Sequence, residues 1–134
     1  MEIVIAVASF FASLLCLLFQ LMIRSKNKQY YIYCLNDSCF RNVDYTYKNN
    51  KKCVKLKHGT TLFGRSNGVD IIIDDNTISR IQFYISNTND SCNIVNLHGI
   101  NPLYVNGKEV EDKQTLSNGD IIKAGNVQMR IMYN

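Results

Sequence analysis

The chain begins with an uncharged apolar run from Ile3 to Ile23, in which Gln20 and a few serines are the only polar residues. As a helix rising 1.5 Å per residue, this run would span ~31 Å, and the hydrocarbon core of a bilayer is about 30 Å thick. A helix that packs into a soluble core carries a polar face, and this run has none. The pattern therefore predicts a transmembrane helix.

A cleaved signal peptide is the alternative for this run. The segment before it, Met1-Glu2, carries no positive charge, the run exceeds the usual apolar length of a signal peptide, and no A-x-A cleavage site follows. An uncleaved anchor is therefore the better interpretation. Arg24, Lys26 and Lys28 follow the run directly, so the positive-inside rule predicts a single-pass protein of the cell membrane with its C-terminal part in the cytoplasm.

After residue 29 the pattern changes to short strand-like runs. Ile81, Phe83 and Ile85 alternate with more polar residues, and the β-branched run 69–73 stops at two acidic residues. Turn residues separate the runs, and no helical period appears. This pattern predicts an all-β sandwich of short antiparallel strands. We therefore expect two parts, an anchor with a basic linker (1–29) and a β domain (30–134).

The start of the predicted β domain is less regular than the rest. We expect a first strand at Tyr30–Leu35 and a further strand at Cys53–Leu56, joined by a long connection. Within it, Phe40–Tyr47 indicates a weaker strand, and Lys48–Lys52 indicates a solvated loop. Near the other end of the chain, Asn106-Gly107 favours a tight hairpin with a type I′ turn.

Charge is distributed unevenly along the chain, whose formal net charge is +4. Residues 24–59 carry a net +7, and residues 60–134 carry a net −2. Tyrosines interleaved with lysines in the basic stretch are also a feature of nucleic-acid-binding surfaces. A basic flank beside a membrane anchor accounts for the charge better, so no nucleic-acid partner is expected.

The five cysteines are odd in number and form no C-x-x-C pair. This argues against a disulfide scaffold and predicts reduced thiols in a cytosolic compartment. A zinc site built from Cys34, Cys39 and Cys53 is the alternative use of these residues. Without a recognisable ligand spacing, we expect no metal.

Enzymatic motifs are missing from the sequence. Neither of the two histidines, His58 and His98, stands in a catalytic motif, and no G-x-S-x-G, P-loop or H-E-x-x-H occurs. Asp74 and Asp75 are adjacent in a strand-like run, where neighbouring side chains point to opposite faces. We therefore expect neither an enzyme nor a bound cofactor.

The chemistry that the sequence does offer is a cluster of anion-binding residues. Two predicted loops place Arg65 and Ser79-Arg80 at strand ends, at one end of the sandwich. A guanidinium group presents a planar, permanently charged fork, and a serine hydroxyl adds one donor. Together these groups suit an oxyanion and, above all, a phosphate.

The ordered set of motifs around these residues resembles the forkhead-associated (FHA) domain. Its members are Gly64-Arg65, Ser79-Arg80-Ile81-Gln82, Asn101 followed by Asn106-Gly107, and the turn and strand at 116–122. The resemblance covers Cys53–Tyr133 well and Tyr30–Lys52 loosely. It implies an FHA-type β-sandwich that binds phosphothreonine in a partner protein.

The resemblance also implies a role for each matched residue. Arg65 would contact the phosphate, Ser79 would donate its hydroxyl to it, Arg80 would add a peptide or phosphate contact, and Asn101 would bond the peptide backbone. Residues that would shape the site are Gly64, Gln82, Asn106 and Gly107. Three positions depart from the family pattern, since Gln82 replaces a buried histidine, Ile100 a threonine and Pro102 a glycine.

These observations predict a membrane-anchored FHA domain that binds a phosphothreonine protein, such as a Ser/Thr kinase or its substrate. Its layout is similar to that of small anchored bacterial FHA proteins, which implies a link to cell-wall or division machinery. The alternative is a degenerate FHA-like domain that assembles with membrane-complex neighbours without phosphate. Ile100 and Pro102 favour this alternative.

Overall fold

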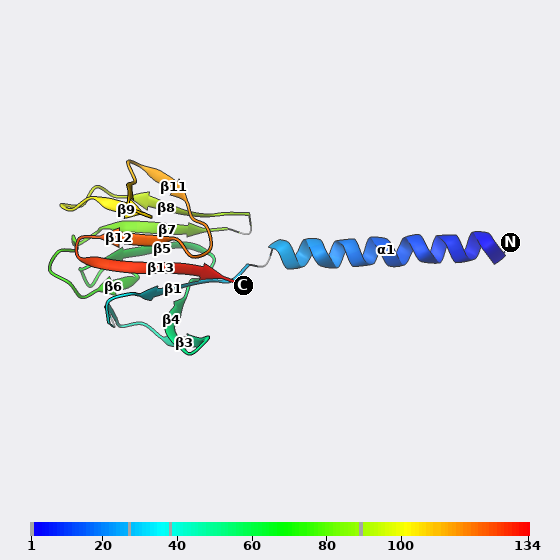
Figure 1. Ribbon diagram of the computed structural model, residues 1–134, viewed down its shortest axis with the longest axis horizontal. Coiled ribbons are helices and arrows are strands. Elements are labelled where there is room, and N and C mark those ends of the chain that lie inside the picture. Colours follow the sequence, from blue (N-terminus) through cyan, green and yellow to red (C-terminus); the bar gives the residue numbers. More distant parts are fainter. Residues whose placement is uncertain (1, 27, 38, 89) are drawn as a thin grey trace.

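A computed structural model describes residues 2–26, 28–37, 39–88 and 90–134, and the side chains at 2 and 23–26 are likewise outside the description. The chain forms one long helix, α1 (Glu2–Lys26), followed only by strands (Figure 1). The stretch Ile3–Met22 has a mean hydropathy of 2.4, and none of it is buried against the rest of the protein. It is long and apolar enough to be a candidate membrane span. The basic flank at Arg24 and Lys26 lies among the side chains outside the description.

Two sheets pack face to face and form the predicted β-sandwich. The order in the seven-stranded sheet is β10 (Lys108–Glu109), β9 (Leu103–Val105), β12 (Ile121–Ala124), β13 (Val127–Tyr133), β1 (Tyr30–Cys34), β4 (Lys51–Lys55) and β3 (Tyr45–Lys48). The order in the six-stranded sheet is β11 (Lys113–Thr115), β8 (Cys92–Asn96), β7 (Phe83–Asn87), β5 (Gly59–Gly64), β6 (Ile71–Ile73) and β2 (Phe40–Arg41). Pairing is antiparallel except between β5 and β6.

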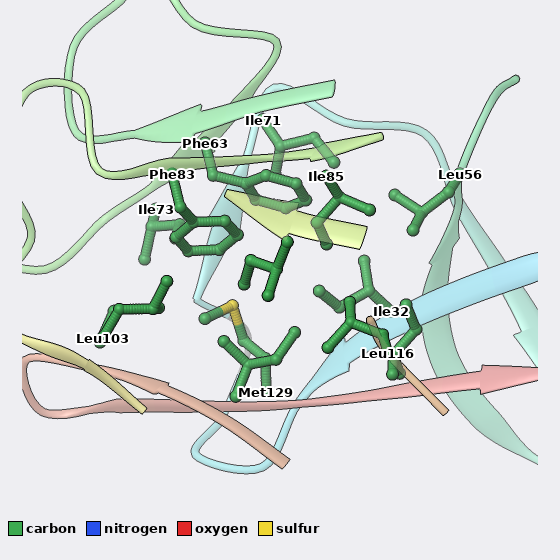
Figure 2. Packing of buried hydrophobic residues seen from close by; sticks show 14 of the residues in the cluster. Ile32, Leu56, Phe63, Ile71, Ile73, Phe83, Ile85, Leu103, Leu116 and Met129 are labelled. Atoms are coloured by element: carbon green, nitrogen blue, oxygen red, sulfur yellow. The ribbon is translucent and has the colours of Figure 1, made fainter. Parts of the chain in front are cut away.

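The core between the sheets follows from the alternation of apolar residues along each strand. Phe63 and Phe83 are fully buried, and their rings stack with centroids 4.6 Å apart. Ile32 and Met129 approach them from the opposite sheet (Figure 2). Every residue of this core lies between Tyr30 and the C-terminus, so the sandwich closes without any contribution from α1.

The strand directions place the loops relative to the anchor. β1 directly follows α1, and the amide of Leu56 donates to the carbonyl of Tyr30, so β5 also starts near this end of the sandwich. β5 therefore runs away from α1, and the loop after Gly64 lies at the far end (Figure 1). The loops after β6 and β8 lie at the same end, because β6 is parallel to β5 and Asn96 pairs with Phe83.

The connection between β1 and β4 differs from the expectation. The single weak strand expected at Phe40–Tyr47 is two strands, β2 and β3, which belong to different sheets. The loop expected at Lys48–Lys52 is shorter, because Lys48 pairs with Lys51 and only Asn49 and Asn50 turn. Both asparagines have positive φ (52° and 62°), a conformation that asparagine tolerates better than most residues.

The cysteines correct a second expectation. A disulfide joins Cys34 to Cys39, whose Cα atoms are 6.1 Å apart, so the prediction of reduced thiols is wrong for this pair. The bond closes the turn between β1 and β2 and takes both sulfurs away from a zinc site. Cys53 and Cys92 are free and buried, and burial raises the pKa of both thiols, that of Cys92 to about 12.

Candidate phosphate-binding site

A cleft of about 490 Å³ opens at the end of the sandwich away from α1. It lies between the loops that follow β5, β6 and β8. Its lining includes all four residues predicted to bind the phosphopeptide, which are Arg65, Ser79, Arg80 and Asn101. It also includes Ile100 and a neighbour that the sequence did not single out, Thr77. The fold thus brings together residues that are up to 36 positions apart in the sequence.

Arg65 is exposed and begins the loop after β5. Its Nε donates a hydrogen bond to the carbonyl of Ile78 (3.1 Å), and its backbone amide donates to the carbonyl of Ser79 (3.0 Å). The terminal guanidinium nitrogens make no hydrogen bond within the described part of the chain. They are therefore available for the two parallel bonds that a guanidinium forms with an oxyanion.

Gly64 is required by the close approach of the two loops. A Cβ atom at this position would overlap the carbonyl oxygen of Arg80. That oxygen belongs to the backbone, so it cannot move aside as a flexible side chain would. The amide of Ser66 donates to that same carbonyl (3.2 Å), which holds the loops together. Glycine at this position therefore sets the distance between the Arg65 loop and the Ser79-Arg80 loop.

Ser79 is half-buried, and its Oγ accepts a hydrogen bond from the amide of Ile100 (2.8 Å). The hydroxyl proton remains free to be donated. Gly99 lies against the Ser79 side chain so closely that a Cβ there would overlap Oγ. No sequence motif indicated Gly99, because its importance arises only once the loop after β8 packs on Ser79.

Gln82 is fully buried and bridges two loops of the cleft. Its Oε1 accepts from the amide of Ser79 (2.9 Å), and its Nε2 donates to the carbonyl of Asn101 (3.2 Å). A side-chain amide supplies one acceptor and one donor in opposite directions, as this position requires. The glutamine thus satisfies two buried backbone groups that would otherwise lack partners.

Asn101 is held in place by its own side chain. Its Nδ2 donates to the carbonyl of Thr77 (2.6 Å), and Thr77 Oγ1 accepts from the amide of Asn126 (2.8 Å). Asp75 receives hydrogen bonds from both the amide and the hydroxyl of Thr77, which lower the pKa of its carboxyl group. Thr77 therefore connects three loops, although no sequence motif contains it.

Comparison with known proteins identifies the family of the β domain. Residues 61–125 match the family model of the FHA domain. The chain contains an FHA domain. The chain is 35% identical over 74 residues to an oxoglutarate dehydrogenase inhibitor of Corynebacterium jeikeium, and the match covers 55% of this chain and 51% of that protein. The chain thus spans about half the length of this curated relative.

Solved FHA structures share the fold of the sandwich. The FHA domain of a Chlamydia trachomatis protein superposes with a TM-score of 0.63 at 24% identity, over 78% of this chain and 96% of the other. The N-terminal FHA domain of Rad53p from S. cerevisiae, solved with a phosphothreonine peptide, gives a TM-score of 0.61 at 19% identity, over 78% and 93%. At these identities the likeness establishes the fold.

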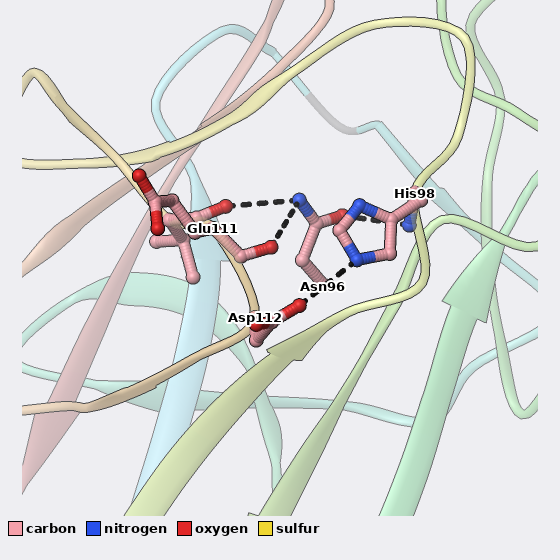
Figure 3. Close-up of polar contacts among 5 residues, drawn as sticks. Asn96, His98, Glu111 and Asp112 are labelled. Carbon is pink, nitrogen blue, oxygen red and sulfur yellow. Dashed lines mark hydrogen bonds and ion pairs between the residues drawn. The ribbon is translucent and has the colours of Figure 1, made fainter.

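A hydrogen-bond network anchors the cleft loop that follows β8 in the FHA domain (Figure 3). Asn96 Nδ2 donates to the carbonyl of Val110 (2.9 Å) and more weakly to that of Glu111 (3.4 Å), and Asn96 Oδ1 accepts from the amide of His98 (2.9 Å). His98 Nε2 lies 3.2 Å from Asp112 Oδ1. The network explains why the loop keeps its shape although His98 is exposed.

The remaining motif residues, Asn106 and Gly107, lie at the other end of β9 from Asn101. Both have positive φ (52° and 80°), as the predicted type I′ turn requires. Asn106 Nδ2 donates to Asp120 Oδ1 (2.9 Å), and Asn106 Oδ1 accepts from the amide of Ile121 (2.9 Å). These residues join two hairpins of the FHA domain and do not line the cleft.

Proposed function

We propose that this protein is a single-pass membrane protein whose cytoplasmic FHA domain binds phosphothreonine in a partner protein. The observation that carries the proposal is the convergence of Arg65, Ser79 and Arg80 on one cleft. Within the described part of the chain, neither arginine forms an ion pair with a carboxylate. Two unpaired guanidinium groups beside a free hydroxyl favour binding of a multiply charged oxyanion.

Each residue has a defined task in this proposal. A phosphothreonine carries close to two negative charges and three strong acceptor oxygens at neutral pH. Arg65 would hold two of these oxygens through its terminal nitrogens, Ser79 would donate its hydroxyl proton, and Arg80 would contact the phosphate or the peptide. Asn101 Nδ2 is engaged with Thr77, so the contact of Asn101 with the peptide backbone would use Oδ1 as an acceptor.

The membrane part of the proposal assigns residues 1–29 to an anchor with a basic linker and residues 30–134 to the FHA domain. The apolar stretch Ile3–Met22 and the cations that follow it support this orientation. A disulfide is unusual in the cytoplasm. In the proposed location, the Cys34–Cys39 disulfide would therefore meet reducing conditions.

The proposed partner is a protein phosphorylated by a Ser/Thr kinase, or the kinase itself, in a pathway tied to cell-wall or division machinery. The proposed role is to hold this partner at the membrane, without catalysis by the FHA domain. The Corynebacterium relative is named an inhibitor, which is consistent with a role exerted through binding.

Binding to a peptide library presented in matched phosphorylated and unphosphorylated forms tests the ligand. We expect retention of phosphothreonine peptides only, and equal retention of both forms would contradict the proposal. A reporter fused to the C-terminus tests the topology, with activity expected in the cytoplasm. Reporter activity outside the cell would contradict the proposed topology. Cleavage of the N-terminal segment from the mature protein would contradict the proposed anchor.

A second candidate function is phosphate-independent assembly within a membrane complex. Two observations favour it, since Ile100 is 92% exposed beside the cleft and Pro102 is exposed in the same loop. An exposed apolar side chain contributes more to contact with a protein surface than to contact with a phosphate. Peptides that bind regardless of phosphorylation, with Arg65→Ala having no effect, would identify this function.

A further inference from the structure

The outward face of the seven-stranded sheet is strongly basic. Side chains alternate between the two faces of a strand, and residues in register share a face. Ile32 pairs with Val54 and Ile131, and all three point into the core, so their strand neighbours point outward. By this register the outward positions of β3, β4, β13 and β12 carry five cations: Lys48, Lys51, Lys55, Arg130 and Lys123.

Nothing in these strands neutralises that charge. β12, β13, β1, β4 and β3 contain no Asp or Glu at any position. The register places Glu109 of the edge strand β10 on the same face, and Asp37 lines a hollow with Lys51, so two acids lie at the margins of the basic face. In the described part of the chain the ion pairs are Arg41–Asp74 and His98–Asp112, and neither involves the outward cations. The corresponding positions of β5, β7 and β8 on the other sheet carry no charge at all. The basic face is therefore a property of one side of the sandwich.

Tyrosine rings hold several of these cations on the surface. Lys48 Nζ lies 4.5 Å from the ring centroid of Tyr31, and Lys51 Nζ lies 5.1 Å from that of Tyr33. Lys28, in the linker after α1, lies 4.5 Å from the ring of Tyr133, which shares the inner face of the sheet with Ile131, so Lys28 is not part of the outward face. A cation over an aromatic face gains electrostatic attraction. The face thus combines fixed positive charge with amphipathic rings.

We propose that this basic face, comprising Lys48, Lys51, Lys55, Lys123 and Arg130, docks on anionic lipid headgroups of the membrane that holds α1. The inference rests on the proposed membrane anchoring. Three residues separate the end of α1 from β1, which lies within this face, so the two are at most about 14 Å apart along the chain. Tyrosine favours the headgroup level of a bilayer, and each nearby Lys or Arg raises affinity for an anionic surface about fivefold.

Docking of the basic face leaves the phosphopeptide cleft open. In Figure 1 the strands run roughly along the axis of α1, so docking requires the sandwich to tilt relative to α1 until the strands lie along the bilayer. The cleft formed by the loops after β5, β6 and β8 would then open parallel to the membrane. A phosphorylated segment of a neighbouring membrane protein would then reach Arg65 without displacing lipid. Docking would thus orient the FHA domain towards partners in the same membrane.

A phosphopeptide extending onto the face is the competing use of the same cations. Lys123 and Tyr104 line a small hollow of about 160 Å³ together with Thr77 and Asn101, which also line the cleft. Of the cations on the basic face, this hollow includes only Lys123 of β12. The cations of β3 and β4 lie across β13 and β1 from it, and Lys55 pairs with Tyr31 next to the linker. Their position favours the membrane.

The test measures co-sedimentation of residues 28–134 with phosphatidylcholine vesicles, with and without phosphatidylglycerol. This piece contains the complete core, so it folds without α1. We expect binding only to the anionic vesicles and its loss at high salt. Lys48→Glu/Lys51→Glu should weaken binding at least ~30-fold. Lys55→Glu/Lys123→Glu, a second pair on the same face, should do the same.

The matched control is Lys108→Glu/Lys113→Glu, which changes the net charge equally but lies on the far edge strand and the other sheet. It should weaken vesicle binding by no more than about threefold, because distant charges are screened. Equal binding to neutral vesicles, or an equal effect of the control, would overturn the proposal. Loss of phosphopeptide affinity with unchanged vesicle binding in Lys48→Glu/Lys51→Glu would assign the face to the peptide instead.

Two further measurements separate this inference from the proposed function. Arg65→Ala should bind anionic vesicles like the wild type. If the domain binds anionic vesicles but no phosphopeptide, the proposed phosphothreonine ligand is wrong, and the proposed lipid-binding face is still supported. Should the full chain be absent from the membrane fraction, the anchor is wrong, and lipid docking at the anchored membrane is overturned with it.

Discussion

Arg65 Nε donates a hydrogen bond to the carbonyl oxygen of Ile78, at a distance of 3.1 Å. This bond joins the loop after β5 to the loop that carries Ser79 and Arg80. The bond uses Nε, and an end-on bidentate contact with an oxyanion uses the two terminal nitrogens, Nη1 and Nη2. Both terminal nitrogens are therefore left for the ligand. The same side chain thus contributes to the shape of the cleft and to its charge.

Substitutions of Arg65 should therefore distinguish the contribution of its positive charge to binding from that of its hydrogen-bond geometry. Hydrogen bonds to a charged partner contribute roughly 1.5–3 kcal/mol each, so Arg65→Ala should weaken phosphopeptide binding by about tenfold to a hundredfold or more. Arg65→Lys keeps the charge but loses both the fork and the bond to Ile78, and should recover only part of the affinity. Titration calorimetry with one phosphothreonine peptide measures both.

The control for these variants is thermal stability. Arg65 is exposed, so neither substitution should shift the melting temperature by more than a few degrees. Full recovery of affinity by Arg65→Lys would show that charge alone matters and would contradict the proposed bidentate contact.

Gln82 offers a prediction about stability. Gln82→Met keeps the length of the buried side chain but removes both of its hydrogen bonds, which leaves the amide of Ser79 and the carbonyl of Asn101 without partners. Each unsatisfied buried group costs about 1–3 kcal/mol, so the free energy of unfolding should fall by about 2–4 kcal/mol. Urea denaturation measures the change. A loss below ~1 kcal/mol would contradict the bridging role.

The comparison between sequence and structure explains which features were predictable. The sandwich, the turn at Asn106-Gly107 and the cleft at Arg65 and Ser79 follow from local alternation, turn residues and an ordered set of motifs. Gly99 and Thr77 were missed, because their contacts with Ser79 and Asn101 exist only between loops that the folded sheets bring together. No local pattern carries that information.

The first connection could not be predicted for a related reason. β2 and β3 are only 2 and 4 residues long, too short for alternation to show. β2 pairs with the distant strand β6 in one sheet, whereas β3 forms a hairpin with β4 in the other. The spacing of Cys34 and Cys39 likewise does not reveal whether their side chains face each other. The pairing depends on the route that the chain takes from β1 to β2.

The Cys34–Cys39 disulfide should stabilise the isolated domain. In the loop-entropy model, closing a loop of this length lowers the conformational entropy of the unfolded chain, which stabilises the folded state by about 2 kcal/mol. We expect dithiothreitol to lower the free energy of unfolding by about that amount in the wild type and to have no effect on Cys34→Ser/Cys39→Ser. Equal stability of the wild type with and without reductant would contradict a formed disulfide.

Cys92 predicts a dependence of stability on alkaline pH. Burial raises the pKa of its thiol from 9.0 to about 12, so the folded state keeps the proton that the unfolded state releases above pH 9. The stabilisation is therefore complete below pH 9 and is lost as the pH rises towards 12, with a slope that approaches about 1.4 kcal/mol per pH unit.

Cys92→Ala isolates this contribution, because Tyr30, Tyr45 and Cys53 also have raised pKa values and act in the same direction. The wild type should lose stability more steeply than the variant between pH 9 and the upper limit of the measurement. Urea denaturation over this pH range provides the comparison. Parallel curves for the two proteins would contradict a buried neutral thiol.

Substitution of Ile100 distinguishes the two candidate functions, phosphothreonine binding and phosphate-independent assembly. It occupies the position of the family threonine and is 92% exposed, and its amide donates to Ser79 Oγ. A backbone donor is unchanged by Ile100→Thr, so the cleft should keep its shape, and the added hydroxyl gives the ligand a further partner. Phosphopeptide affinity should stay equal or rise by up to about tenfold, the equivalent of one neutral hydrogen bond.

Ile81→Thr is the matched control, because Ile81 is also an exposed isoleucine on the cleft, at 51%. If the cleft binds phosphate, Ile81→Thr should not raise affinity, and the effect of Ile100→Thr should disappear with unphosphorylated peptide. If the exposed isoleucines instead contact a protein neighbour, both substitutions should weaken that association, since each removes apolar contact area. An affinity loss in both variants, independent of phosphorylation, would reject the phosphothreonine proposal and favour the assembly function.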